Sequence, residues 1–191
     1  MKNKKIGLSV AVAGLVGALA VGGTLAYFTD SDNASNVFTM GKVGIDLVED
    51  SDDGKAVEIT DDGIFYDRIV PGDVVSKVAN VVVDSDSEDA YIRVMITADS
   101  DSEELLEQLA AFTDEIRKEV ADGEDWSLGD DGYLYYKDIV SADDTINIFD
   151  TVTIPSDWGN EIAGKSFKIN ITAYAVQADN FDGEWSEVTF E

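Results

Sequence analysis

Apolar and polar residues alternate along most of the chain from Val43 onward. In the segment 43–48, Val43, Ile45 and Leu47 fall on one side of an extended backbone, as expected for a half-buried strand. Segments with a similar strand-like composition occur at 64–70, 74–83, 90–97, 133–140, 145–154, 166–177 and 187–190. The pattern therefore predicts about eight strands.

Residues with turn-forming chemistry separate these segments. Glycine, proline and aspartate supply the backbone conformations that tight turns require. They occur together in Asp52-Asp53-Gly54, Asp61-Asp62-Gly63, Pro71-Gly72-Asp73, Gly129-Asp130-Asp131-Gly132 and Asp182-Gly183. Short strands separated by frequent turns predict an all-β fold, a jelly-roll-like antiparallel β-sandwich, formed as a single domain by residues 43–191.

One segment, at about 102–121, has a helical pattern instead. Its apolar residues recur at spacings of three and four, which places them on one helical face. They are Leu105, Leu109, Phe112, Ile116 and Val120. Ser100 and Glu103 suggest a capping box at the start of this helix. The amphipathic helix either covers an edge or end of the sheet, or presents a face to a partner.

The first residues of the chain have the pattern of an export signal. Lys2, Lys4 and Lys5 precede an uncharged stretch at 6–25, and Gly22-Gly23 interrupts its helical tendency near the end. We expect cleavage between Ala26 and Tyr27, so that residues 1–26 form the signal peptide. The stretch is also long enough for a retained membrane anchor, and this alternative stays open.

Residues 27–42 form a polar lead-in to the domain, and its first part is a candidate assembly arm. The arm consists of Tyr27, Phe28, Thr29, Asp30, Ser31, Asp32, Asn33, Ala34, Ser35 and Asn36. An extended segment of this kind can add a strand to an open sheet edge of another subunit. The alternative is a frayed terminus without a partner.

The chain is strongly acidic, with 40 acidic and 13 basic residues and a net charge of −27. Loss of residues 1–26 removes three lysines and no acids, which leaves a net charge of −30. Such a surface repels phosphate groups and anionic lipids, which argues against nucleic acid and membrane surfaces as partners.

The absence of histidine and cysteine limits the catalytic chemistry that is possible. Triads with a histidine base, cysteine nucleophiles and the two-histidine zinc motif all need these side chains. Carboxylate pairs remain, but none stands out in an apolar setting, and no glycine-rich phosphate loop precedes a helix. We therefore expect no enzymatic activity and no catalytic residue.

Acidic loops are the remaining candidate cation sites. The leading group consists of Asp84, Asp86, Glu88 and Asp89. Calcium takes six to eight oxygen ligands, which alternating acids in a loop can supply, but the glycine of an EF-hand loop is missing. Two interpretations stay open: a solvated loop, or weak calcium binding with no other cofactor.

Several aromatic residues lie in or beside the predicted strands. They are Trp126, Tyr133, Tyr135, Tyr136, Trp158 and Trp185. Core packing is the favoured interpretation, and a sugar-stacking platform is the alternative.

Five segments together resemble one family of secreted proteins. They are GGTLAYFTDSD at 22–32, NVFTMGKVGIDL at 36–47, IVPGDVVSKVANVVVDSDSEDAYIRVMI at 69–96, TIPSDWGNEIAGKSFKI at 153–169 and ITAYAVQADNFDG at 171–183. In this order they resemble the TasA and camelysin (CalY) group of Gram-positive bacteria. The resemblance implies a jelly roll, processing by a SipW-type signal peptidase, and an extracellular location in the matrix or at the cell surface.

The resemblance also implies a function. TasA-like members are subunits of biofilm matrix fibres, so we expect a homopolymer built by donor-strand addition, together with minor or accessory fibre proteins as further partners. Camelysin-type relatives are described as proteases, which implies a metallopeptidase role that the residues here do not support. A monomeric adhesion or binding module at the cell surface is the third alternative.

Overall fold

Antiparallel strands are the main secondary structure in this computed structural model, which describes residues 29–33, 43–51, 55–60, 63–66, 69–159, 162, 164–179, 181–185 and 188. The larger sheet has the strand order β1-β10-β6-β8-β7. Its strands are β1 (Thr29–Asn33), β10 (Lys168–Gln177), β6 (Ala90–Asp99), β8 (Leu134–Tyr136) and β7 (Trp126–Leu128). β10 and β6 pair along their whole length, from Lys168 opposite Asp99 to Gln177 opposite Ala90.

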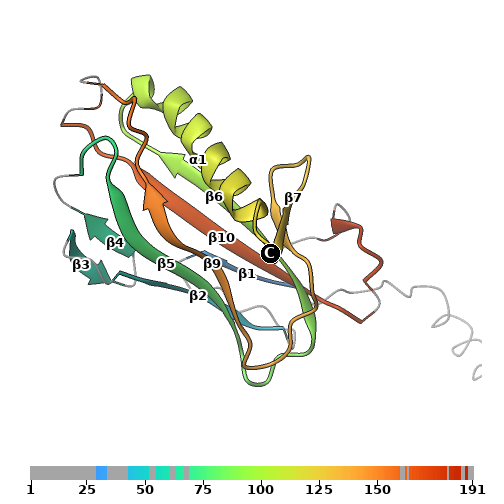
Figure 1. Cartoon of the computed structure of the whole chain (residues 1–191). Coiled ribbons are helices and arrows are strands. Elements are labelled where there is room, and N and C mark those ends of the chain that lie inside the picture. Colours follow the sequence, from blue (N-terminus) through green and yellow to red (C-terminus); the bar gives the residue numbers. More distant parts are fainter. Residues whose placement is uncertain are drawn as a thin grey trace, which may run out of the picture.

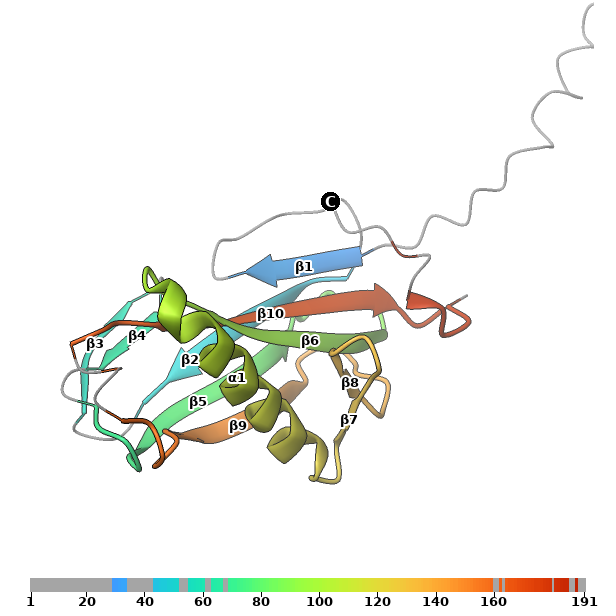
Figure 2. The same ribbon diagram turned by 90° about the horizontal axis from the view of Figure 1, so that it is seen from above.

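The smaller sheet has the strand order β2-β5-β9. It consists of β2 (Ile45–Asp50), β5 (Val74–Val83) and β9 (Thr145–Thr153), with a bulge between β5 and β9 near Ala79. A separate hairpin, β3 (Ala56–Thr60) and β4 (Gly63–Tyr66), lies at the opposite end of the molecule from β7 and β8 (Figures 1 and 2).

The core follows the alternating pattern of the two long strands. Every second residue of β5 from Val75 to Val83 is buried, and so are Ile92, Val94 and Ile96 of β6. Burial of one such aliphatic side chain contributes about 1.5–3 kcal/mol. The fold therefore rests on apolar packing, in a chain that contains no cysteine and hence no disulfide.

The helical segment begins with a short 3₁₀ turn, η1 (Glu103–Leu105), and continues as α1 (Leu106–Ala121). Its buried side chains are Leu105, Leu109, Phe112, Thr113, Ile116 and Val120. α1 packs against β6 and β7, with further contacts to β8 and β9, and it lies along the sandwich in Figures 1 and 2. Its apolar face therefore covers the protein's own sheets. This agrees with the predicted helix that covers the sheet and not with one that presents this face to a partner.

The expected capping box is wrong. The Ser100 hydroxyl donates to the carbonyl of Ser166 at 2.6 Å and accepts the N–H of Ser102 at 3.1 Å. Ser102, the residue before the 3₁₀ turn, makes no side-chain capping bond. Ser100 thus joins the start of the helical segment to the chain that leads into β10.

The predicted fold class, an all-β protein with one inserted helix, is confirmed. β5 has the predicted bounds, and β9 and β10 differ from theirs by one or two residues. The predicted strand at 133–140 is only β8, followed by an isolated bridge from Val140 to Ala90. β3 and β7 were not expected, and most of the predicted strand at 187–190 lies outside the described residues.

Candidate functional site

The edge of the larger sheet is formed by part of the candidate arm. β1 pairs with β10 in an antiparallel register that runs from Thr29 opposite Val176 to Asn33 opposite Thr172. Figure 2 shows β1 alongside β10, at the outer side of the sheet. Without β1, this side of β10 would present unpaired backbone groups, which are a template for another strand.

β1 is attached less extensively than the strands beside it. It contains five residues, Thr-Asp-Ser-Asp-Asn, whereas β10 and β6 have ten each. Aspartate and asparagine are poor strand formers, and a backbone hydrogen bond contributes only about 0.5–1.5 kcal/mol net. The sequence of β1 therefore favours a strand only weakly, and β1 forms because it can pair with the edge of β10.

The described structure covers only the middle of the predicted arm. Thr29, Asp30, Ser31, Asp32 and Asn33 form β1. Ala26, Tyr27, Phe28, Ala34, Ser35 and Asn36 lie outside the described residues. The cleavage site therefore stays a prediction, and so does the part that Tyr27 and Phe28 play in assembly.

Asp84 is the most constrained of the four calcium candidates. It directly follows β5, its N–H donates to the carbonyl of Gly44 at 2.9 Å, and its carbonyl accepts the N–H of Ser87 at 3.1 Å. Its carboxylate is half-buried against Gly44. Burial raises the pKa of Asp84, and the neighbouring carboxylates of Asp46 and Asp86 raise it further.

The other three candidates, Asp86, Glu88 and Asp89, are exposed. Among the residues that the structure describes, no group of three or more acidic side chains is arranged to hold a metal ion. Weak calcium binding stays a prediction without geometric support in this loop.

The aromatic residues separate into two groups. Trp126 and Trp158 are buried, as the core interpretation predicts. The indole N–H of Trp126 donates to the carbonyl of Asn147 at 2.9 Å, and Tyr136 packs on the indole with ring centroids 5.2 Å apart. Trp158 packs edge-on against Phe112, with ring centroids 5.2 Å apart. These rings secure α1 and β9 to the body of the sandwich.

The second group surrounds Arg93, a residue that the sequence analysis did not single out. Arg93 is 8% exposed, and its guanidinium carbon lies 4.1 Å from the ring centre of Tyr133, 5.2 Å from that of Tyr174 and 4.7 Å from that of Trp185. Tyr174 of β10 and Tyr135 of β8 are its register partners on either side. The sequence does show that Arg93 is the one basic residue of the predicted strand 90–97. It does not show the strand register, which decides which tyrosines lie opposite Arg93.

The Arg93 cluster, formed by Arg93, Tyr133, Tyr174 and Trp185, also holds the segment after β10 over the larger sheet. Phe181 packs on Tyr91 at 5.5 Å and on Trp185 at 5.3 Å between ring centroids. Trp185 in turn packs on Tyr135 at 5.8 Å. Burial raises the pKa of Tyr135, and its hydrogen bond to Asp131 adds to this effect. Because the rings pack against Arg93 and one another, the cluster is arranged for internal packing.

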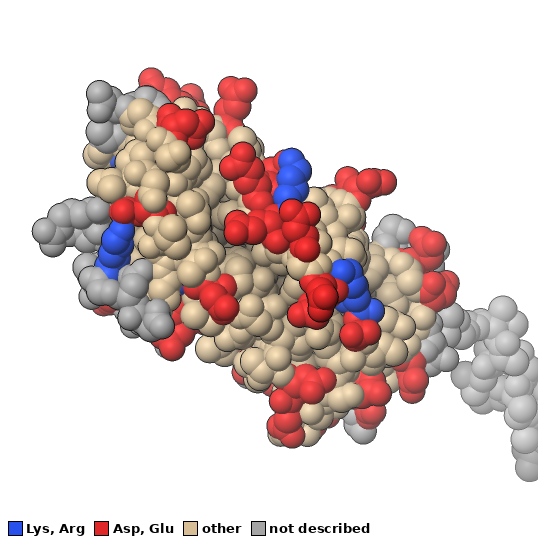
Figure 3. Space-filling view, viewed as in Figure 1, with Lys and Arg blue, Asp and Glu red and all other residues tan. Residues whose placement is uncertain are grey.

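Carboxylates dominate among the charged side chains. Figure 3 shows acidic side chains spread over the viewed face, with few basic ones among them. Lys118 pairs with Asp114 at 2.5 Å within α1, and Lys165 pairs with Glu104 of η1 at 2.6 Å. No helix among the described residues is both long and apolar enough to span a membrane.

Comparison with known proteins places the chain in a family. No curated protein and no solved structure matches the chain. A family model described as camelysin metallo-endopeptidase matches residues 1–118, which extend from the signal-like segment through β6 into α1. This match covers more than half of the 191 residues. The resemblance predicted from the sequence is thereby confirmed, and the chain belongs to the camelysin metallo-endopeptidase family.

Proposed function

We propose that the protein is a secreted structural subunit that forms extracellular fibres by exchanging β1 between copies. The observation that carries the proposal is the pairing of β1 with β10 at the edge of the larger sheet. A second copy of the chain contains the same segment and offers β10 the same backbone donors and acceptors. β1 of one copy can therefore replace β1 of the next without any new type of contact.

Exchange of this kind produces an open chain of subunits. Each copy donates one strand and accepts another at a different place on its surface, so the contact is head-to-tail and repeats. The strand lost from the chain's own sheet and the strand gained from a neighbour have the same sequence. The balance between single molecules and fibres is therefore set by concentration and by repulsion between subunits more than by the pairing itself.

The proposal includes export and processing. Cleavage between Ala26 and Tyr27 by a SipW-type signal peptidase would leave two residues before β1. A strand close to a chain end can leave one sheet and enter another without moving a folded element on that side. We place the mature protein outside a Gram-positive cell, in the matrix or at the cell surface, where minor or accessory fibre proteins are further partners.

Cysteine cross-linking tests the exchange directly, because the natural chain has no cysteine. Asn33 and Thr172 are opposite each other in the β1–β10 register, and facing residues of paired strands are close enough for a disulfide. In a chain that begins at Tyr27 and carries N33C and T172C, oxidation of single molecules is expected to link the cysteines within one chain. Oxidation of fibres is expected to give a ladder of covalent multimers.

The matched control combines N33C with N170C, which lies two residues away from the register partner on β10. This pair is expected to cross-link poorly in both states. Fibres in which the N33C and T172C pair joins only cysteines of the same chain would contradict the exchange. A chain that begins at Tyr27 and never polymerises would contradict the fibre proposal as a whole and would favour the monomeric adhesion module.

The family description supports a second candidate, a metallo-endopeptidase. Against it, the chain has no histidine or cysteine, and the described residues include no cluster that could hold a metal ion. A peptidase of this class needs a bound metal to activate water. Metal analysis of the purified protein, combined with a casein assay with and without chelator, decides between the two: stoichiometric zinc and chelator-sensitive cleavage would support the peptidase.

A further inference from the structure

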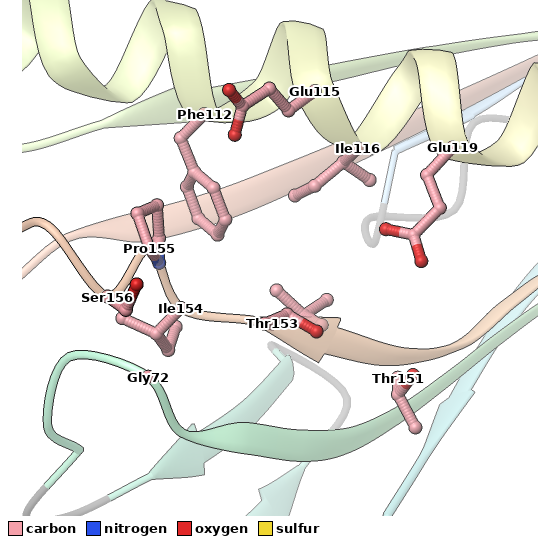
Figure 4. Close-up of a pocket in the computed structure, with 11 residues that line it drawn as sticks. Gly72, Phe112, Glu115, Ile116, Glu119, Thr151, Thr153, Ile154, Pro155 and Ser156 are labelled. Atoms are coloured by element: carbon pink, nitrogen blue, oxygen red, sulfur yellow. The ribbon is translucent and has the colours of Figure 1, made fainter.

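The smaller sheet ends in a second open edge, at β9. In the strand order β2-β5-β9, β9 pairs with β5 on one side only. Figure 4 shows β9 between α1 and β5, so that its other edge faces α1. Among the described residues, the backbone of β9 from Ile148 to Thr153 makes no hydrogen bond outside the ladder with β5. This edge therefore has backbone donors and acceptors available to another strand.

A groove lies between this edge and α1. Its volume is about 270 Å³, and it is lined by side chains of α1, the end of β9 and the turn that follows. Phe112, Ile116 and Val152 line it and are 2%, 6% and 2% exposed, which gives the groove an apolar floor. Glu115 and Glu119 line it from α1 and are exposed, which gives it an acidic rim.

The two rim carboxylates differ from Asp114 and Glu104, which pair with basic residues. Asp114 pairs with Lys118, and Glu104 pairs with Lys165. In the described structure, neither Glu115 nor Glu119 forms an ion pair. They are four residues apart on one helix, a spacing at which like charges repel. A positively charged partner in the groove would relieve this repulsion.

We propose that this α1–β9 groove binds a short, extended, basic segment of a different protein, which adds a strand to β9. Side chains of such a strand alternate between the apolar floor and the acidic rim, so a segment of alternating apolar and basic residues fits best. The protein's own arm does not fit, because residues 27–36 contain Asp30 and Asp32 and no basic residue. A second copy is disfavoured in the same way by its net charge of −27.

This interaction is independent of β1 exchange, since it uses the opposite sheet. The probe is a fluorescent peptide of alternating lysine and valine, and its binding to the purified full chain is followed by fluorescence anisotropy. The double variant E115Q/E119Q is compared with E103Q/E107Q, which removes the same charge from exposed positions that do not line the groove. Circular dichroism establishes that both variants are folded.

We expect E115Q/E119Q to weaken binding about threefold to tenfold and E103Q/E107Q to weaken it less than about twofold. Equal weakening by the two variants would overturn the proposal, because it would mean that the peptide is attracted to the overall negative charge of the protein and not to the groove. Failure of the natural chain to bind the peptide would overturn it as well.

Two further peptides test the added strand. One carries N-methyl groups on the valine amides and the other carries them on the lysine amides, so that each removes the donors along one edge of the peptide. We expect one of the two to bind at least about tenfold more weakly, because it can no longer donate to β9. If both bind as well as the unmethylated peptide, pairing with β9 is excluded.

Discussion

The carboxylate of Asp84 occupies the space that a side chain at position 44 would need. A Cβ atom on Gly44 would lie 2.1 Å from Oδ2 and 2.7 Å from Cγ of Asp84. The same two residues are joined by a backbone hydrogen bond at the start of β2 and the end of β5. This close approach fixes the start of β2 against the end of β5.

Gly44→Ala is expected to destabilise the protein by about 1–3 kcal/mol, because the added methyl group displaces the Asp84 carboxylate from its half-buried position. The measurement is chemical denaturation of the purified variant. Asp84→Ala in the same chain should recover a substantial part of the loss, since the clash is with that side chain. A double variant no more stable than Gly44→Ala alone would place the clash elsewhere.

Asp84 also makes stability dependent on pH. Its pKa in the folded protein is raised above the ordinary aspartate value of 3.8, so the folded state favours the protonated acid. This contribution is fully present below the unfolded-state value and is lost as the pH rises through the folded-state value. Asp84→Asn, which stays uncharged, is therefore expected to be more stable than the natural chain at neutral pH.

The advantage of Asp84→Asn should disappear in acid, where Asp84 itself is protonated. Melting temperatures of both chains, measured from neutral pH into acid, test this prediction. Asp86→Asn is the control: it removes one exposed charge from the same loop and should change the pH profile less. Parallel profiles for Asp84→Asn and the natural chain would show that Asp84 has no such linkage.

Replacement of Arg93 is expected to reduce stability even when the positive charge is kept. Arg93→Lys keeps the charge but loses the planar group that packs on Tyr133, Tyr174 and Trp185. We expect a loss of about 1–3 kcal/mol. Tryptophan emission should shift to the red, because Trp185 loses its packing while Trp126 and Trp158 stay buried. Unchanged emission and stability would show that any cation suffices at this position.

Fibre formation is expected to depend on ionic conditions. Subunits that begin at Tyr27 carry a net charge of −30 and repel one another. Acid, salt or divalent cations reduce this repulsion, so light scattering should rise faster when any of them is added. Magnesium compared with calcium at equal concentration separates screening from specific calcium binding. Assembly that is indifferent to pH and to all added ions would contradict the role of charge.

The elements predicted best from the sequence are those with a long periodic pattern. β5 and α1 are defined by their own apolar spacing, since one face of each is buried in the core. β1 has no such pattern: its residues are polar, and it is a strand only because the edge of β10 is available. Ser100 was assigned a helix cap because its nearest partners in sequence are on the helix, whereas Ser166 provides the partner in space.

The candidate sites show the same limit. The segment 27–36 could be proposed as an arm from its composition, but its pairing with β10 depends on the order of strands in the sheet. Arg93 acquires its surroundings from β8, β10 and the segment after β10, which come together only through the fold. The α1–β9 groove likewise depends on which edge of β9 is left free by β5. These properties are non-local, and residue spacing does not contain them.

The antiparallel alignment of β1 with β10 has a mechanical consequence. Five residue pairs lie side by side along β10, so a pull directed along the strands loads the hydrogen bonds between them together. A pull directed across the strands separates the pairs one after another, starting from one end. A joint of this construction resists lengthwise tension better than peeling.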